Sequence, residues 1–171
     1  MHRRQPLPRL WLMTDERQGE TLWTALERLP AGAGLVFRHY GLPKEARQRL
    51  FLRVKRIAKR KRLVLVGSDI PWRADGIHNG RSHAQRPGLR TAAAHNLREI
   101  RLAERRGADL LFLSPVFPTR SHPEAKTLGR RRFSLLARQT RLPSIALGGM
   151  NEKRARGLAG AYGWAAIDAW S

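Results

Sequence analysis

Short apolar runs alternate along the chain with longer basic, amphipathic stretches, and this alternation is typical of repeated strand and helix units. The runs that we expect to form strands are Leu10–Thr14, Leu35–Tyr40, Leu63–Gly67, Gly76–His78, Thr91–Ala94, Leu110–Val116, Ser144–Gly148 and Trp164–Ala169. Strands joined through helices pair in parallel, and about eight of them are enough to close a barrel. The alternation therefore predicts an α/β protein built around a single parallel sheet.

The stretches between these runs are expected to form helices at Glu20–Leu29, Lys44–Arg62, Leu97–Arg106, Arg131–Thr140 and Glu152–Ala161. The second has the clearest periodicity, because Leu50, Val54, Ile57 and Ala58 make one apolar stripe. Its many arginines are then expected to lie on a solvated outer face.

Two connections do not fit the usual pattern. Parallel strands normally need a crossover of about a dozen residues or more, but the third and fourth predicted strands are joined by a shorter link, Asp69–Asp75. No helical stretch follows the eighth strand, and Asn79–Leu89 is expected to be an irregular loop. We therefore expect the helices after strands 3 and 8 to be abbreviated or missing.

Length and composition favour one domain, residues 1–171, which is shorter than the ~250 residues of a typical eight-stranded α/β barrel. No apolar run reaches the ~18 to 20 residues of a membrane span, and the basic N-terminal segment has too short an apolar part for a signal peptide. A cytoplasmic location is therefore expected. The sequence has no cysteine, which excludes disulfides, thiolate metal sites and cysteine nucleophiles.

The chain is strongly basic, with a formal net charge of +21 from 34 Lys and Arg against 13 Asp and Glu. Such an excess attracts nucleic acids, anionic membranes or phosphorylated small molecules. The basic residues are spread over every predicted helix, so a solvated basic surface is the simplest interpretation. Charge alone does not choose among these partners.

Three motifs carry the most specific information. The central one is the strand and loop at residues 110–123, LLFLSPVFPTRSHP. It is preceded by TAAAHN at residues 91–96 and followed by LPSIALGGM at residues 142–150. The central motif resembles "GPIFPTxTK" of the thiamine phosphate synthase and thiazole tautomerase (TenI-like) family. The preceding motif resembles the family's "GVSAHT", and the following one resembles its "PVVAIGGI". The resemblance spans most of residues 34–170 and implies the family fold, a (β/α)₈ TIM barrel, here shortened.

The resemblance also implies a reaction and a set of ligand-binding residues. Family synthases couple hydroxymethylpyrimidine pyrophosphate to thiazole phosphate and release pyrophosphate with the help of Mg²⁺. Glycines at the end of the seventh strand let backbone N–H groups approach a phosphate, although they also suit a plain tight turn. The residues expected to bind substrate or phosphate, from the motifs and from the ends of the last three strands, are Thr119, Ser121, His122, Gly148, Gly149 and Ala169.

The chain departs from the family on the pyrophosphate side. Of the family's "QLREK" only Arg38 matches, and Tyr40 stands at the lysine position. Asp69 matches the metal-binding aspartate of "NDR" after a slip of one residue, and His83 replaces the second metal carboxylate. Arg38 is therefore the expected catalytic cation, and Asp69 is the expected metal ligand.

His95 occupies the position of the acid and base histidine of the thiazole tautomerase branch. An imidazole of ordinary pKa exchanges protons readily near neutral pH. The alternative is a polar residue beside the start of the next helix, where Asn96 is the better N-cap. Both interpretations of His95 stay open at this point.

The sequence thus favours a synthase-type transferase of thiamine biosynthesis that binds phosphorylated small molecules. The alternatives are a thiazole phosphate tautomerase using His95, a non-catalytic binder of phosphorylated thiamine precursors, and a basic protein that binds nucleic acid. A homo-oligomer is left open, and no membrane partner is expected.

Overall fold

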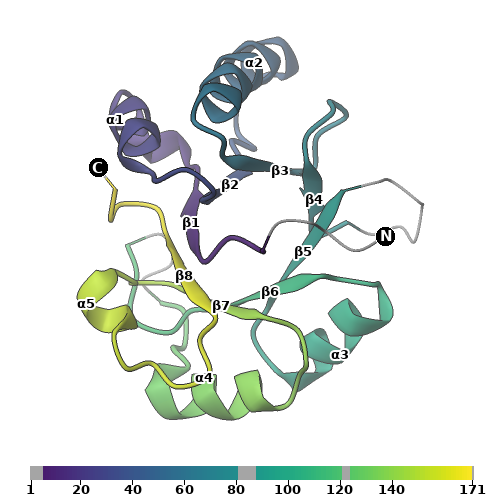
Figure 1. Cartoon of the computed structure of the whole chain (residues 1–171), viewed down its shortest axis with the longest axis vertical. Coiled ribbons are helices and arrows are strands. Elements are labelled where there is room, and N and C mark those ends of the chain that lie inside the picture. Colours follow the sequence, from purple (N-terminus) through teal and green to yellow (C-terminus); the bar gives the residue numbers. More distant parts are fainter. Residues whose placement is uncertain (1–5, 81–87, 121–123, 171) are drawn as a thin grey trace.

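The computed structural model describes residues 6–80, 88–120 and 124–170 and shows one closed barrel of eight parallel strands, each paired with its neighbours in chain order (Figure 1). The strands are β1 (Leu10–Met13), β2 (Gly34–Phe37), β3 (Val64–Ser68), β4 (Gly76–His78), β5 (Leu89–Ala94), β6 (Leu110–Leu113), β7 (Ser144–Leu147) and β8 (Gly163–Ala166). The barrel closes where Leu10–Leu12 of β1 pair with Trp164–Ala166 of β8. The predicted eight-stranded α/β barrel is confirmed.

The inside of the barrel is filled by alternate residues of the strands. Trp11 and Phe112 are fully buried there and meet edge to face, with ring centroids 5.2 Å apart. Gly34 on the neighbouring strand leaves room for Trp11, because a Cβ at this glycine would lie 2.2 Å from the indole. The interior is therefore a packed core, and a ligand has space only at its mouth.

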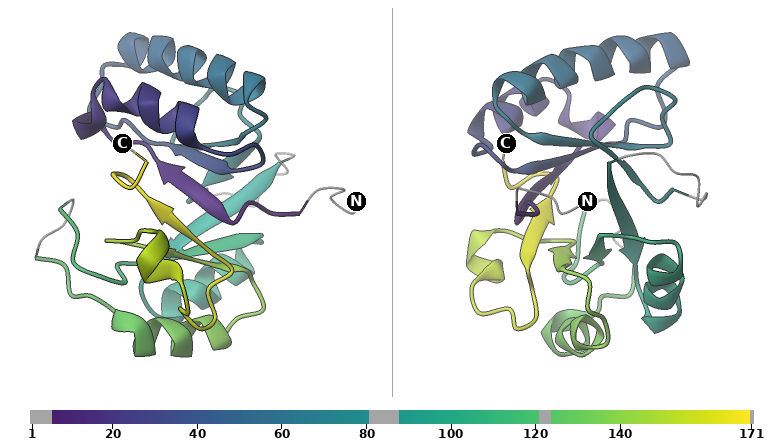
Figure 2. Two further views of the ribbon diagram at one scale, coloured as in Figure 1. Left: turned by 60° about the vertical axis from the view of Figure 1, so that its left-hand side comes forward. Right: turned by 45° about the vertical axis from the view of Figure 1, so that its right-hand side comes forward.

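The helices cover two opposite sides of the barrel (Figures 1 and 2). A short 3₁₀ turn at Glu16–Gln18 and helices α1 (Thr21–Arg28) and α2 (Lys44–Arg60) follow β1 and β2, and helices α3 (Leu97–Arg105), α4 (Gly129–Arg138) and α5 (Glu152–Ala155) follow β5, β6 and β7. Among the described residues, no helix joins β3 to β4 or follows β8. The prediction that the connection between strands 3 and 4 lacks a full helix is confirmed.

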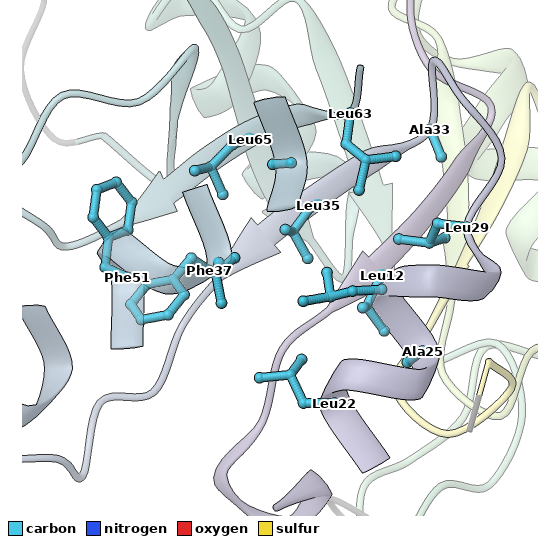
Figure 3. Packing of buried hydrophobic residues seen from close by; sticks show 13 residues of the cluster. Leu12, Leu22, Ala25, Leu29, Ala33, Leu35, Phe37, Phe51, Leu63 and Leu65 are labelled. Carbon is cyan, nitrogen blue, oxygen red and sulfur yellow. The ribbon is translucent and has the colours of Figure 1, made fainter. Parts of the chain in front are cut away.

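The outward side chains of β1, β2 and β3 pack against α1 and α2, as Figure 3 shows for Leu12, Leu35 and Leu65. On α2 the buried residues are Phe51, Val54 and Ala58, whereas Leu50 and Ile57 are only partly buried. The predicted stripe therefore holds for part of the helix, but its centre is Phe51, which the sequence analysis did not include.

Trp72 compensates for the missing helix after β3. It lies in the short β3–β4 link, and its ring centroid is 5.4 Å from that of Phe51 on α2. Ile70 and Ala74 of the same link also pack against this core. A segment without a helix thus still shields part of the barrel wall.

The last predicted helix, Glu152–Ala161, was wrong in its length. The observed helix ends at Ala155, and Gly157 and Gly160 follow with φ of 70° and 83°. These left-handed conformations cannot continue a right-handed helix, and glycine adopts them easily. In the same way β2 ends at Phe37, before the predicted Tyr40, because the chain turns at His39 with φ of 43°.

The chain after β8 folds back on the barrel. The ring of Trp170 stacks on that of Trp164 with centroids 4.9 Å apart and planes at 7°. Both indoles pack against the core beneath α4 and α5. Within the described residues, no helix is both long and apolar enough to span a bilayer.

Candidate active site

A cavity of about 280 Å³ opens at the C-terminal ends of the strands. This is the end of the fold where α/β barrels carry their active sites. Its lining comes from strand ends and the following loops: Met13, Arg38, Tyr40, His78, Asn79, Ala93, His95, Ser114, Pro115, Thr119, Ala125, Leu147, Gly148 and Ile167. The predicted site residues Arg38, His95, Thr119 and Gly148 are thus brought together.

Arg38 is the cation of the cavity wall, and its guanidinium is held from behind. Its Nε donates to the carbonyl of Thr14 and its Nη2 donates to Asp15, both at 2.8 Å. In the described part of the chain these bonds leave Nη1 for a ligand. Burial acts to raise the pKa of Asp15, but hydrogen bonds from Arg17 and the charges of Arg17 and Arg38 outweigh it and lower this pKa. Asp15 is therefore a carboxylate that keeps Arg38 oriented.

Two further residues of the β2 end support this wall. The Thr14 hydroxyl accepts a hydrogen bond from the Arg38 backbone N–H at 3.0 Å and lies 2.9 Å from Nδ1 of His39. Burial lowers the pKa of His39, so its imidazole is neutral at physiological pH. The Tyr40 hydroxyl lies 2.6 Å from Oγ of Ser68 and joins the ends of β2 and β3.

His78 at the end of β4 forms part of the cavity floor. Its Nδ1 lies 2.9 Å from the Thr91 hydroxyl, and its ring meets Phe112 edge to face at 5.4 Å. Burial, together with the positive charge of Arg38, lowers the pKa of His78 from 6.5 to about 3. The imidazole is therefore neutral at physiological pH and offers a hydrogen bond without a charge.

This buried histidine gives the fold a pH dependence. Because the pKa is lower in the folded protein, the unfolded chain takes up the proton first as the pH falls below 6.5, and stability is lost until about pH 3. When the pH falls from 7 to 4.5, we expect the protein to lose about 2 to 3 kcal/mol of unfolding free energy because of His78. Urea denaturation at both pH values measures this loss, and a His78→Gln variant should show a correspondingly shallower dependence. An equal pH dependence of the unfolding free energy in parent and variant would contradict the attribution of this loss to His78.

His95 lies at the rim of the cavity, just before α3. Its Nδ1 lies 2.7 Å from Oε2 of Glu99, which also accepts the His95 backbone N–H at 2.8 Å. Asn96 is the N-cap of α3, as predicted, because its side chain accepts from the Glu99 N–H. Burial acts to raise the pKa of Glu99, but hydrogen bonds from His95 and Asn96 outweigh it and lower this pKa. The carboxylate thus orients the imidazole while it completes the helix cap.

The opposite wall comes from the ends of β6 and β7. Gly148 has φ of 94°, and a Cβ at this position would lie 2.7 Å from Cα of Pro115. Gly149, with φ of 59°, is not among the lining residues, and its carbonyl accepts a hydrogen bond from Arg154. Ala169 is exposed and also outside the lining. Of the predicted phosphate-binding residues, Gly148 and Thr119 line the cavity, and Ser121 and His122 lie outside the described residues.

A protein site for Mg²⁺ does not fit this cavity. All 13 Asp and Glu of the sequence lie in the described residues, and none of them lines the cavity. Asp69, the expected metal ligand, follows β3 but is exposed outside the lining. The described residues also contain no cluster of three His, Asp or Glu side chains suited to a metal. Since Mg²⁺ prefers carboxylate oxygens, the described lining residues do not supply a protein site for it.

Ten of the 14 lining residues were not assigned to the site from the sequence. Tyr40, Ser114 and Ile167 line the cavity at or near the ends of β2, β6 and β8. His78, at the end of the fourth predicted strand, also lines the cavity. The available signal was their common position at strand ends, which all converge at one mouth in a parallel barrel.

The thiamine monophosphate synthase family profile matches residues 10–170 of the chain. The chain belongs to this family. A protein of Aquifex aeolicus named "Putative thiamine-phosphate synthase 2" is 30% identical over 179 residues, which cover 94% of this chain and 96% of that protein. The thiamine-phosphate synthase of Coprothermobacter proteolyticus is 34% identical over 132 residues, which cover 68% of this chain and 63% of that protein.

A solved structure supports the fold of this thiamine monophosphate synthase family member. Thiamine phosphate pyrophosphorylase from Pyrococcus furiosus matches with a TM-score of 0.77 and 24% identity, covering 94% of this chain and 85% of that chain. The family predicted from the three motifs is confirmed, and with it a synthase-type enzyme. The roles of the individual site residues stay predictions.

Proposed function

We propose that this chain couples hydroxymethylpyrimidine pyrophosphate to thiazole phosphate. In this reaction the bond from the pyrimidine methylene carbon to the pyrophosphate oxygen breaks, and the thiazole nitrogen forms a bond to the same carbon. Pyrophosphate leaves with both electrons of the broken bond. The observation that carries the proposal is the cavity with Arg38 on one wall and Gly148 on the other.

Arg38 is proposed to receive the departing pyrophosphate. Its charge is fixed by Asp15 and the Thr14 carbonyl before substrate arrives, so little reorganisation is needed as negative charge develops. His78 is neutral and next to Asn79 on the lining, which suits hydrogen bonding to an uncharged heterocycle.

The thiazole phosphate is proposed to bind on the Gly148 and Thr119 side. Gly148 brings the β7 backbone to the cavity surface without a side chain, and Thr119 adds a hydroxyl. Ser121 and His122, which follow Thr119 in the sequence, are proposed to bind the phosphate, with Gly149 and Ala169 at its outer edge. The proposed ligands are thus phosphorylated small molecules, and the biosynthetic family favours the cytoplasm as the compartment.

The synthase assay tests this function directly. Purified protein is incubated with both precursors and Mg²⁺, and thiamine phosphate is measured by mass spectrometry, with each precursor omitted in turn as the control. We expect product only when both precursors are present. Absence of product, together with thermal stabilisation by the precursors, would instead identify a non-catalytic binder.

The His95 and Glu99 pair favours a second candidate, a thiazole phosphate tautomerase. Glu99 at 2.7 Å holds Nδ1 of the imidazole, which leaves Nε2 to exchange a proton with a ligand at the rim. Isomerisation of a thiazole phosphate without Mg²⁺ or the pyrimidine substrate would identify this activity. A His95→Gln variant with an unchanged isomerisation rate would exclude it.

A further inference from the structure

Arg47 in the first turn of α2 reaches back to the ends of two strands. Its Nε and Nη2 donate to the carbonyl of Arg38 at 3.0 and 2.6 Å. Its Nη2 also donates to the carbonyl of Ser68 at 2.7 Å, and its Nη1 donates to that of Asp69 at 2.8 Å. All three guanidinium nitrogens therefore bind backbone oxygens at the ends of β2 and β3.

These carbonyls belong to segments with costly backbone conformations. His39 and Asp69 have backbone φ of 43° and 49°. Residues other than glycine adopt such positive values only at a cost of about 1 to 3 kcal/mol. Hydrogen bonds from a guanidinium are charge-assisted and strong. These bonds offset part of the cost of the two turns, and they orient the carbonyl dipoles toward the guanidinium of Arg47.

Arg47 is linked to the cavity through two other residues. It is not among the lining residues, whereas Arg38 and Tyr40 are. Its guanidinium lies 5.5 Å from the centroid of the Tyr40 ring, and the Tyr40 hydroxyl bonds to Ser68. Moving Arg47 would therefore shift both the carbonyl of Arg38 and the ring of Tyr40.

We propose that Arg47 is a positioning residue for the pyrophosphate end of the active site, because it fixes where Arg38 and Tyr40 meet the substrate. This proposal rests on the synthase function proposed above. A lysine at this position keeps the charge, but one ammonium cannot reproduce the planar fork that serves three carbonyls.

The test compares Arg47→Met and Arg47→Lys with Arg56→Met, a control on the exposed face of the same helix. The values of kcat and KM are measured for each substrate in turn. In both Arg47 variants we expect kcat/KM for the pyrimidine pyrophosphate to fall about tenfold to a hundredfold, while the KM for thiazole phosphate stays within about twofold of the parent. The Arg56 control should match the parent for both substrates.

A purely structural role predicts something different, namely a lower melting temperature and less active protein with both KM values unchanged. That outcome, or an equal rise in both KM values, would overturn the proposal. If Arg47→Met does not fold, Arg47→Lys carries the comparison.

Binding of inorganic pyrophosphate, measured by calorimetry, separates this proposal from the synthase function. We expect the parent to bind pyrophosphate about tenfold more tightly than Arg47→Lys. If the parent makes no thiamine phosphate but this difference remains, the synthase function fails and the role of Arg47 stands. Equal affinities would overturn the role of Arg47 whatever the parent catalyses.

Discussion

An Arg38→Met variant is expected to lose a hundredfold to about a thousandfold in kcat for thiamine phosphate formation, the usual effect of removing one preorganised charge-stabilising donor. The reason is geometric as well as electrostatic. Asp15 and the Thr14 carbonyl hold the guanidinium in place, and Arg38 is the lining cation among the described residues. Methionine keeps much of the length of the side chain but offers no donor to the leaving group. Steady-state kinetics with both substrates at saturation measure the effect.

Two companion variants make this result specific. Arg49→Met removes an exposed arginine of α2 and should keep the parent kcat, which excludes a general effect of lost positive charge. Asp15→Asn keeps Arg38 but weakens its orientation, so we expect a smaller loss, about tenfold. A kcat for Arg38→Met within threefold of the parent would show that the leaving group is stabilised elsewhere.

A Gly148→Ala variant is expected to lose about 2 to 5 kcal/mol of unfolding free energy, the sum of a left-handed backbone penalty and overpacking. The φ of 94° disfavours any side chain, and the new Cβ would lie 2.7 Å from Cα of Pro115, a backbone atom of the neighbouring β6 loop. Relief of this contact must move one wall of the cavity. Urea denaturation measures the stability, and calorimetry with thiazole phosphate should show weaker binding in the protein that still folds.

Gly107→Ala is the matched control for this prediction. Gly107 also has a positive φ, 72°, but no atom lies within 4 Å of a Cβ added there. It should therefore lose only the backbone penalty of about 1 to 2 kcal/mol and bind thiazole phosphate normally. Equal losses for the two variants would mean that the β6 loop yields easily and that Gly148 does not fix the cavity wall.

The positions of the strands followed from the sequence because each strand is a local apolar run between turn-forming residues, and the family resemblance implied that they close into a barrel. Even the three-residue strand Gly76–His78 has the predicted bounds. Element ends were less predictable, since they depend on single backbone conformations. Arg62, with φ of 56°, lies beyond the observed end of α2 at Arg60, although the residue type gives no such signal.

The site was predictable where a motif coincided with a strand end, as at Arg38, His95 and Gly148. It was not predictable which of two adjacent residues would face the cavity. Gly148 lines it and Gly149 does not, because the chain turns between them. Arg47 was missed for a related reason. In the helical pattern it is one more arginine of a solvated face, and the carbonyls that it binds come from turns that no periodicity describes.

The stacked indoles of Trp164 in β8 and Trp170 after it give the protein an intrinsic spectroscopic probe. Two stacked, nearly parallel indoles at this distance are close enough for their electronic transitions to couple, so we expect them to contribute to the near-ultraviolet circular dichroism and to the fluorescence. Ile167 lines the cavity and lies between Trp164 and Trp170 in the chain. We therefore expect a ligand that displaces Ile167 to change the stacking of these indoles, so that ultraviolet spectroscopy follows binding without an attached dye.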